Sequence, residues 1–189
     1  MVKKRAYARF FGLEAKKTGG VWLPLLSPTV ALNKVTDITP RLLKKLNVEA
    51  ILLDVDNTLA FPGSQKPFPG TVEWSWKLRN DGYRMIIMSN NFRSRVRPFA
   101  LQYGLPFIAT SMKPLPMAFG YAAKFLGSSR ERSLVVGDQV FTDILGANLA
   151  RMKSVLLDPP AQENSISFLI RRCMERSVRR KAQRKRKEK

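Results

Sequence analysis

The sequence predicts an α/β fold in which a five-stranded parallel sheet is covered by helices. Between about Thr39 and Asp158, short apolar runs rich in β-branched residues alternate with segments of helical length, the order typical of parallel sheets with crossover helices. Runs such as Ile51-Leu52-Leu53 are apolar without interruption, as burial on both faces of a sheet requires. The 189 residues are 44% hydrophobic, so a domain of ordinary size can bury a core.

The strands are expected where the short apolar runs lie. In chain order these are Ala50–Val55, Tyr83–Met88, Pro106–Thr110, Ser133–Val136 and Ser154–Leu157. Helices are expected between them, and one more precedes the first strand. They are Pro40–Leu46, Gly70–Asp81, Arg93–Tyr103, Leu115–Leu126 and Phe141–Arg151. The chain contains no internal repeat, so these elements form one domain over residues 36–160.

The lack of histidine restricts the chemistry that the chain can perform. Histidine general bases, histidine metal ligands and serine–histidine or cysteine–histidine mechanisms are excluded. Catalysis must then use carboxylates, lysine, hydroxyls or a metal held by oxygen. Cys173 is the single cysteine, which excludes a disulfide framework within one chain and favours a reducing compartment.

The C-terminal segment, residues 161–189, is expected to be a basic helix or tail. From Arg171 onward it has eleven basic and two acidic residues, and so carries +9 of the net charge of +20. Its last part has few apolar residues and repels itself, which is typical of a segment that is disordered or helical only when bound. A solubility tail, an anionic membrane surface and nucleic acid phosphates all stay open as explanations.

Residues 1–35 are expected to form a basic and apolar N-terminal arm. Basic residues lead into an apolar run in which Pro24 and Pro28 are expected to prevent a helix. The run is too short to span a bilayer, which needs about 20 apolar residues. Charges beside Phe10, Phe11 and Trp22 suit a contact on a membrane surface. An arm packed on the domain fits equally well, and an Arg-rich transit peptide is a further alternative.

Polar side chains follow four of the expected strands, at the point where each strand ends. In chain order these are Asp54 and Asp56, then Ser89 with Asn90 and Asn91, then Lys113, and finally Asp138 and Asp143. Ligands of open α/β sheets gather outside the carboxyl ends of the strands, so these groups are expected to share one site. Because side chains alternate along a strand, Asp54 and Asp56 are expected to point to the same side, where their repulsion calls for a cation.

Each polar set by itself has an ordinary structural explanation. Asp54 and Asp56 resemble part of a calcium loop, although the glycine and the terminal glutamate of such a loop are missing. Ser89 and the asparagines after it fit a helix cap. Lys113 fits a loop, and Asp138 after a glycine fits a turn. The occurrence of four such sets at the ends of four successive strands favours a common site instead.

In this order, Asp54-x-Asp56-Asn57-Thr58, Ser89, Lys113 and Gly137-Asp138-x-x-x-x-Asp143 resemble the four motifs of the haloacid dehalogenase-like (HAD) hydrolase superfamily. The resemblance covers about residues 36–160. It implies a Rossmann-like three-layer sandwich with the first strand in the centre of the sheet. It also implies a phosphoryl transfer in two steps.

The resemblance implies a catalytic pair and a magnesium site. Asp54 would be the nucleophile that forms an aspartyl phosphate, and Asp56 would protonate the leaving oxygen and then activate water. The Asp54 carboxylate and the backbone carbonyl of Asp56 would bind Mg²⁺. Asp138 would be a third ligand, with Asp143 nearby as ligand or support. Magnesium prefers hard oxygen ligands such as these.

The resemblance also implies a phosphate-binding set. Ser89 and Lys113 would hold the transferring phosphoryl oxygens, aided by backbone N–H groups at Asn57 and Asn90. Elementary chemistry agrees with these roles, because a carboxylate is a weak nucleophile toward an anionic phosphate. It must be desolvated and aligned, and Mg²⁺ together with Lys113 supplies the neutralising charge.

The motif spacing excludes a cap domain. The 32 residues between Asp56 and Ser89 are filled by a loop, a helix and a strand, and the 23 residues between Ser89 and Lys113 by a helix and a strand. Many members of the superfamily carry a cap in one of these slots, which closes over small substrates. A site without a cap suits a phosphate displayed on something large, such as a membrane lipid, a nucleic acid end or a protein side chain.

Within the cap-less subclass IIIA, the motifs at 37–40, 54–59, 89–91, 113–114 and 137–143 resemble the phosphatidylglycerophosphate phosphatase group. This resemblance implies conversion of phosphatidylglycerophosphate to phosphatidylglycerol, with anionic membrane lipid as both substrate and docking surface. The expected location is cytoplasmic and peripheral to a membrane, and a plastid or mitochondrial location stays open.

Three other functions stay open at this stage. The charge of +20 also suits a phosphatase for nucleic acid ends, which would bind nucleic acid through the basic tail. A phosphoprotein phosphatase would use the same cap-less site. A non-enzymatic RNA- or ribosome-binding protein on the same fold is disfavoured, because every catalytic position is filled. The sequence indicates no particular partner protein.

Overall fold

The computed structural model describes residues 22–158 together with residues 178 and 180, and it confirms the predicted α/β fold. Its parallel sheet has six strands, not the five that the sequence predicted, in the order β1-β6-β5-β2-β3-β4. Their bounds are β1 Val30–Leu32, β2 Ala50–Leu53, β3 Arg84–Met88, β4 Phe107–Ile108, β5 Ser133–Gly137 and β6 Lys153–Leu157. The first predicted strand, now β2, lies in the middle of the sheet between β5 and β3.

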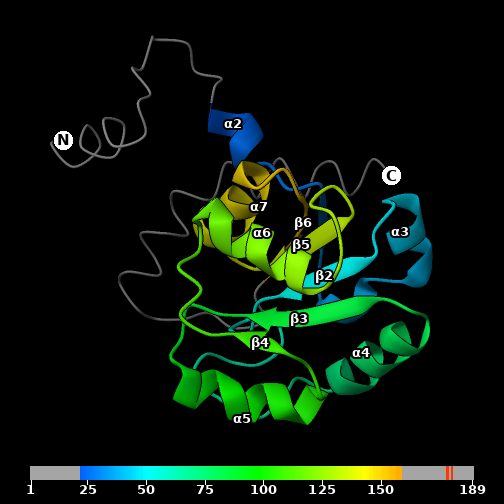
Figure 1. The fold of residues 1–189 in the computed structure, drawn as a ribbon, viewed down its shortest axis with the longest axis vertical. Coiled ribbons are helices and arrows are strands. Elements are labelled where there is room, and N and C mark those ends of the chain that lie inside the picture. The colour runs from blue at the N-terminus through cyan, green and yellow to red at the C-terminus, as the bar shows by residue number, and fades with distance from the viewer. Residues whose placement is uncertain (1–21, 159–177, 179, 181–189) are drawn as a thin grey trace, which may run out of the picture.

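Helices cover both faces of this sheet, so the fold is a three-layer sandwich. The α-helices are α2 Trp22–Leu25, α3 Pro40–Lys45, α4 Thr71–Asn80, α5 Arg93–Tyr103, α6 Pro116–Phe125 and α7 Leu145–Leu149. A 3-10 turn, η1, spans Val35–Asp37, and a π-helical turn, η2, spans Val140–Ile144. Helices α4 and α5 lie on one side of the sheet, and α6 and α7 lie on the other (Figure 1).

Strand β1 is the element that the sequence did not predict. It lies within the segment expected as an N-terminal arm and pairs with β6, with Val30 opposite Val155. Just before it, the Thr29 backbone N–H donates to Ser154 Oγ at 3.3 Å and the Ser154 N–H donates to Thr29 Oγ1 at 3.0 Å. A strand of three residues directly after Pro28 and Thr29 is too short for a periodic pattern, so only its long-range pairing reveals it.

A second difference concerns the proline-containing run ahead of β1, where no helix was expected. Residues Trp22–Leu25 form the four-residue helical turn α2. Pro24 is tolerated because the first turn of a helix needs no backbone N–H from it. The Asn148 side-chain amide of α7 donates to the carbonyls of Leu25 and Ser27 at 2.6 and 3.1 Å. These bonds fasten the segment to the domain.

Strand β2 shows how one strand serves both layers. Ile51 and Leu53 pack in the cluster under α4 and α5, which contains Phe99, whereas Leu52 packs with Phe119 of α6. Because successive side chains of a strand point to opposite faces, an apolar run is required here, as the sequence predicted. Phe99 and Phe119 are both 0% exposed, so replacing either by alanine is expected to cost about 3–5 kcal/mol of stability.

An ion-pair cluster joins the amino ends of the three central strands. Glu49, just before β2, contacts Arg84 at the start of β3 at 3.1 Å and Arg132, just before β5, at 2.7 Å. The side chains are 33%, 41% and 47% exposed, respectively. Water therefore screens these pairs, and each is expected to stabilise the fold by less than about 1 kcal/mol.

The two basic ends of the chain lie largely outside the described residues. The expectations for residues 1–21 and for most of the 161–189 tail are therefore not addressed by the structure. Val178, one described residue of the tail, is buried against Val140, Ile144 and Leu156. Within the described part of the chain, no helix is long and apolar enough to cross a membrane.

Candidate active site

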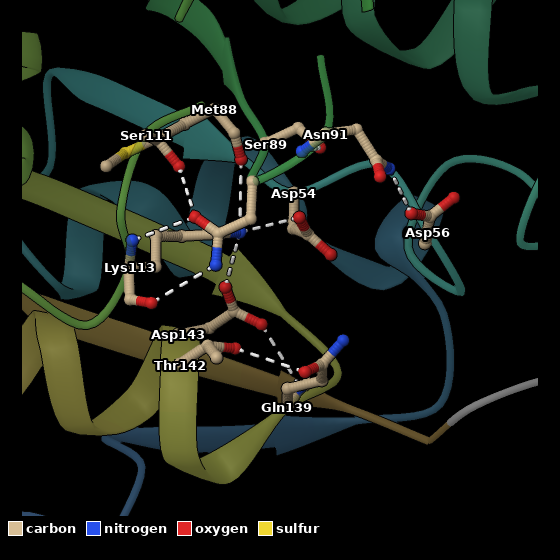
Figure 2. A network of polar contacts seen from close by, with 11 residues as sticks. Asp54, Asp56, Met88, Ser89, Asn91, Ser111, Lys113, Gln139, Thr142 and Asp143 are labelled. Carbon is tan, nitrogen blue, oxygen red and sulfur yellow. Dashed lines mark hydrogen bonds and ion pairs between the residues drawn. The ribbon is translucent and has the colours of Figure 1, made fainter. Parts of the chain in front are cut away.

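The carboxyl ends of the strands bring four of the predicted polar residues together (Figure 2). Asp54 follows β2, Asp138 follows β5, Asp143 lies in η2, and Lys113 comes from the loop between β4 and α6. The strand expected over Ala50–Val55 ends earlier, at Leu53, although the Asp54 backbone N–H still donates to the Val136 carbonyl of β5 at 2.9 Å. All four residues are buried, with exposures between 0% and 8%.

Lys113 is the centre of this buried cluster. Its ammonium Nζ donates to Asp54 Oδ1 at 2.6 Å, to Asp143 Oδ1 at 2.7 Å and to the Met88 carbonyl at 3.1 Å. An ammonium group has three donors, so each one is used. The Lys113 charge is thereby fixed between two carboxylates that come from different loops (Figure 2).

Burial and charge shift the pKa values of this cluster in opposite ways. The pKa of Asp54 is raised to about 7, chiefly because the group is buried. The Asp143 carboxylate adds to this rise and the Lys113 ammonium opposes it. Burial lowers the pKa of Lys113, but the carboxylates of Asp143 and Asp54 raise it by more, so the net shift is upward. Lys113 therefore stays charged, and added positive charge beside Asp54 would favour its ionised form.

The carboxylates of Asp54, Asp138 and Asp143 form a cluster that fits a divalent cation. One oxygen from each lies within 4.8 Å of the others, and all three residues are buried. Three carboxylates at such short range repel one another, and a cation among them relieves that repulsion. Hard oxygen ligands in this number suit Mg²⁺, which retains water for its remaining positions.

Gly137 permits the close approach of Asp143 to the sheet. A Cβ atom at residue 137 would lie 2.2 Å from Asp143 Oδ2, which is impossible without displacing the carboxylate. The same oxygen accepts a hydrogen bond from the Gln139 backbone N–H at 3.1 Å. Asp143 lies in the π-helical turn η2, where the sequence predicted a regular helix, and such turns are frequent at functional sites.

Asp56 is held apart from this cluster by Asn91 and Arg95, a contact that the sequence did not predict. Its Oδ2 accepts from the Asn91 side-chain amide at 2.6 Å, and its Oδ1 pairs with Arg95 Nη2 at 3.0 Å. Figure 2 shows Asp56 beside Asn91, away from Lys113 and Asp143. Asp54 and Asp56 thus lie at one edge of the sheet, but their carboxylates have different partners.

Arg95 connects Asp56 to the loop that precedes α4. Besides its contact with Asp56, its Nη1 donates to the Ser64 carbonyl at 2.9 Å, and the Gln65 amide donates to the Arg95 carbonyl at 3.0 Å. The only sequence signal for this role is that Arg95 lies in the first turn of α5, four residues after Asn91.

The remaining predicted site residues occupy the loops around the cluster. Ser89 Oγ accepts from the Asn91 backbone N–H at 3.2 Å. Asn90 Oδ1 accepts from the Ser111 hydroxyl at 2.9 Å and from the Lys113 backbone N–H at 2.8 Å, so this side chain fastens the Lys113 loop. The backbone N–H of Asn57, which was expected to face the phosphoryl group, donates to the Ala60 carbonyl at 2.8 Å.

Comparison with known proteins gives a family match and a curated relative that cover most of this domain. The haloacid dehalogenase-like hydrolase family matches residues 39–151. The probable phosphatase YqeG of Bacillus subtilis is 33% identical over 151 residues, which are 80% of this chain and 88% of that protein.

A partial match and a solved structure add to this comparison. The mitochondrial phosphatidylglycerophosphatase GEP4 of Saccharomyces cerevisiae is 30% identical over 118 residues, 54% of this chain and 63% of that protein. The cobalt-bound deoxy-D-mannose-octulosonate 8-phosphate phosphatase YrbI of Haemophilus influenzae superposes with a TM-score of 0.52. It is 19% identical, and the match covers 62% of this chain and 73% of that one, so this likeness concerns the fold alone.

Proposed function

Because this chain belongs to the haloacid dehalogenase-like hydrolase family and is a phosphatase of that type, we propose that it is a magnesium-dependent phosphatidylglycerophosphatase acting at a membrane surface. The observation that carries the phosphatase chemistry is the buried cluster of Asp54, Lys113, Asp138 and Asp143. A nucleophilic carboxylate, a fixed ammonium and a set of oxygen ligands for a cation are what phosphoryl transfer to a carboxylate requires.

The proposed reaction proceeds in two steps through an aspartyl phosphate. A carboxylate oxygen of Asp54 attacks the phosphorus, the bond to the leaving oxygen breaks, and that oxygen takes the Asp56 proton as the alcohol departs. Water then returns a proton to Asp56 and attacks the phosphorus of the acyl phosphate. This step releases inorganic phosphate and restores Asp54.

Asp54, Asp138 and Asp143 would hold the Mg²⁺ ion, which when bound supplies positive charge for the phosphoryl oxygens. Lys113 contributes the second positive charge and aligns Asp54 through the 2.6 Å contact. Arg95 and Asn91 hold the Asp56 carboxylate in one orientation, and Asp56 would take up a proton before it protonates the leaving oxygen. Burial of the cluster keeps bulk water away from the nucleophile.

Three observations support a lipid as the substrate. The segments from β2 to β3 and from β3 to β4 hold one α-helix each, α4 and α5, so neither contains a cap domain. Without a cap, a headgroup can enter while its chains remain in the bilayer. The yeast relative is a phosphatidylglycerophosphatase, although only 54% of this chain matches it. Finally, a chain of charge +20 is attracted to anionic lipid.

The test offers one preparation of the full chain three substrates in the same magnesium buffer. They are phosphatidylglycerophosphate in vesicles, an oligonucleotide with a terminal phosphate and a phosphopeptide. We expect the highest kcat/KM on the lipid, with phosphatidylglycerol as the product, and no phosphate release by Asp54→Asn. A higher kcat/KM on the oligonucleotide would favour a nucleic-acid-end phosphatase, and hydrolysis of none would favour a binding protein.

Metal binding has a readout that does not depend on turnover. Ligands that bind only the folded protein raise its melting temperature, so Mg²⁺ is expected to raise that of the wild type. Asp138→Asn removes one of the three carboxylates at nearly constant volume and is expected to lose most of this rise. A rise of equal size in this variant would contradict the assignment of Asp138.

A further inference from the structure

We propose that an apolar rim beside the active site is the surface by which this protein docks on a bilayer of anionic phospholipid. The rim consists of Phe92, Met112, Leu115 and Met117, which are 76%, 58%, 37% and 75% exposed. The inference rests on the proposed function, since it names the surface through which the site would meet a lipid substrate. It adds a contact on the folded domain itself, separate from the two basic ends of the chain.

Two of the rim residues come from the loops that hold the reacting groups, and Leu115 and Met117 follow at the start of α6. Phe92 directly follows Asn91, whose side chain contacts Asp56, and Met112 directly precedes Lys113, which contacts Asp54. The two loops are bonded to each other, because the Thr110 backbone N–H donates to the Asn91 carbonyl at 2.8 Å. Figure 2 shows Asn91, Ser111 and Lys113 around Asp54, so the rim residues adjoin the place that the substrate phosphate would occupy.

The backbone holds Met112 in an unusual conformation. Thr110 and Met112 have φ values of +48° and +55°, in the left-handed region that residues with a Cβ rarely adopt. Such residues persist only where the surroundings enforce them, and they cluster at functional sites. Here the Asn90 side chain binds the Ser111 hydroxyl and both backbone groups of Lys113, so the loop beneath the exposed Met112 is firmly held.

Exposed apolar side chains on rigid loops suit insertion into a bilayer. Large apolar groups gain by leaving water, and loops that are already ordered lose little entropy on binding. Phenylalanine, leucine and methionine can enter the boundary between headgroups and acyl chains while the domain stays outside. The terminal phosphate of the substrate projects outward from that boundary at the end of the headgroup, so a rim inserted there would bring Asp54 to the height of the headgroups.

The charge around the rim favours an anionic bilayer over a neutral protein surface. Residues 89–117, which carry the whole rim, contain no acidic residue and four basic ones. Two of these, Arg93 and Arg97, are exposed at the start of α5, close in sequence to Phe92. Basic groups beside an apolar surface are attracted to anionic headgroups and draw the apolar groups to the interface.

The structure offers a matched control for this surface. Trp76 on α4 and Leu101 on α5 are 59% and 69% exposed, as apolar as the rim, and neither lies on the two loops that hold the reacting groups. The test variant is Phe92→Ser/Met112→Ser/Met117→Ser, and the control is Trp76→Ser/Leu101→Ser. Both are made in the full chain, and turnover of the soluble substrate p-nitrophenyl phosphate shows that each is folded and active.

The experiment measures sedimentation with vesicles of phosphatidylcholine, with and without phosphatidylglycerol, and turnover of phosphatidylglycerophosphate in the same vesicles. The rim variant is expected to bind anionic vesicles at least about tenfold more weakly than the wild type. It should show a raised KM for the lipid and unchanged turnover of p-nitrophenyl phosphate. The control should bind like the wild type, and Met117→Trp should bind more tightly, since tryptophan favours the membrane interface.

Equal vesicle binding by the rim variant and the wild type would overturn the inference, as would an equal loss in the control. The rim could instead mediate self-association, which ultracentrifugation without vesicles would detect. If it does so and the protein binds no vesicles, the surface contacts a second copy of the chain, and the inference is also overturned. This test and the test of the proposed function can fail independently. If the wild type does not hydrolyse phosphatidylglycerophosphate, the proposed substrate is wrong. The comparison of vesicle binding between the rim variant and the wild type still tests whether the rim docks on a bilayer.

Discussion

Two ion-pair clusters lie at opposite ends of the same sheet, and they differ in burial and in charge balance. At the amino ends of the strands, Glu49 contacts Arg84 and Arg132 at 3.1 and 2.7 Å, with side chains 33% to 47% exposed. At the carboxyl ends, Lys113 contacts Asp54 and Asp143 at 2.6 and 2.7 Å, with side chains at most 8% exposed. The distances are similar, but the surroundings are not.

The difference in burial indicates that the cluster around Glu49 is structural and that the cluster around Lys113 is suited to chemistry. The exposed cluster has one carboxylate between two guanidinium groups, and water screens what remains of its charge. In the buried cluster the Lys113 ammonium contacts two carboxylates, and an oxygen of Asp138 lies within 4.8 Å of an oxygen of each. Water does not screen the charges there, and desolvated charged groups of this kind are typical of functional sites.

The largest effect is expected at Asp54, the proposed nucleophile of the buried cluster. Asp54→Asn keeps the shape of the side chain but removes the carboxylate that would attack the phosphorus, so kcat should fall by about 10⁴-fold or more. Phosphate release by purified protein, with circular dichroism to confirm the fold, measures this. Retention of a tenth of the wild-type kcat would contradict the role of Asp54.

Lys113→Met should affect both turnover and stability. It removes a charge that holds Asp54 and faces the phosphoryl group, so kcat/KM should fall by about 10²- to 10³-fold. Without metal, it also leaves two buried carboxylates without their partner, so the free energy of unfolding should fall by about 3 kcal/mol in urea titration. Loss of activity with no change in the metal-free stability would show that Lys113 acts in turnover but does not stabilise the fold.

A smaller effect is expected at Arg95, whose contact with Asp56 is half-buried. Arg95→Ala should lower kcat by about 10- to 100-fold on alkyl phosphates, because these need a proton for the leaving oxygen. The loss should be smaller on p-nitrophenyl phosphate, whose leaving group needs little help. The exposed Arg97, on the same helix, is the matched control. Arg97→Ala should have the wild-type kcat on alkyl phosphates and on p-nitrophenyl phosphate. Equal losses on both would mean that Arg95 does not act through Asp56.

The smallest effect is expected at the exposed cluster. Glu49→Gln breaks both of its ion pairs, yet the free energy of unfolding should change by less than about 1 kcal/mol. Turnover of p-nitrophenyl phosphate should not change, because Glu49 lies at the opposite end of β2 from Asp54. If the free energy of unfolding falls by more than about 2 kcal/mol in urea titration, the difference in burial does not explain how the two clusters differ in energy.

The sequence contained enough to predict which residues meet at the carboxyl ends of the strands. Asp54, Lys113 and Asp138 follow continuous apolar runs, and parallel strands bring their carboxyl ends to one edge. The same reasoning could not find Arg95, because an arginine in the first turn of a helix usually faces water and has no distinguishing neighbour in sequence. It also missed the π-helical turn around Asp143, which depends on the approach of that carboxylate to Gly137.

The sequence likewise predicted some elements of the fold and missed others. Elements with a clear apolar pattern, such as α5, lie where the sequence placed them. Strand β1 has only three residues and half-buried side chains, and its existence depends on β6, more than 120 residues away in the chain. Pairing over such a distance leaves no local trace, so it could be found only in three dimensions.

The central claim is that the buried cluster transfers a phosphoryl group to Asp54, and trapping that group tests it most directly. The Asp56→Asn protein is mixed with magnesium and p-nitrophenyl phosphate, whose leaving group needs little help from Asp56, then quenched in acid and digested, and the peptides are analysed by mass spectrometry. We expect one added phosphoryl group on the peptide that carries Asp54, and none when Asp54 is also replaced by asparagine or when magnesium is chelated. A phosphoryl group on any other residue, or on the doubly substituted protein, would contradict it.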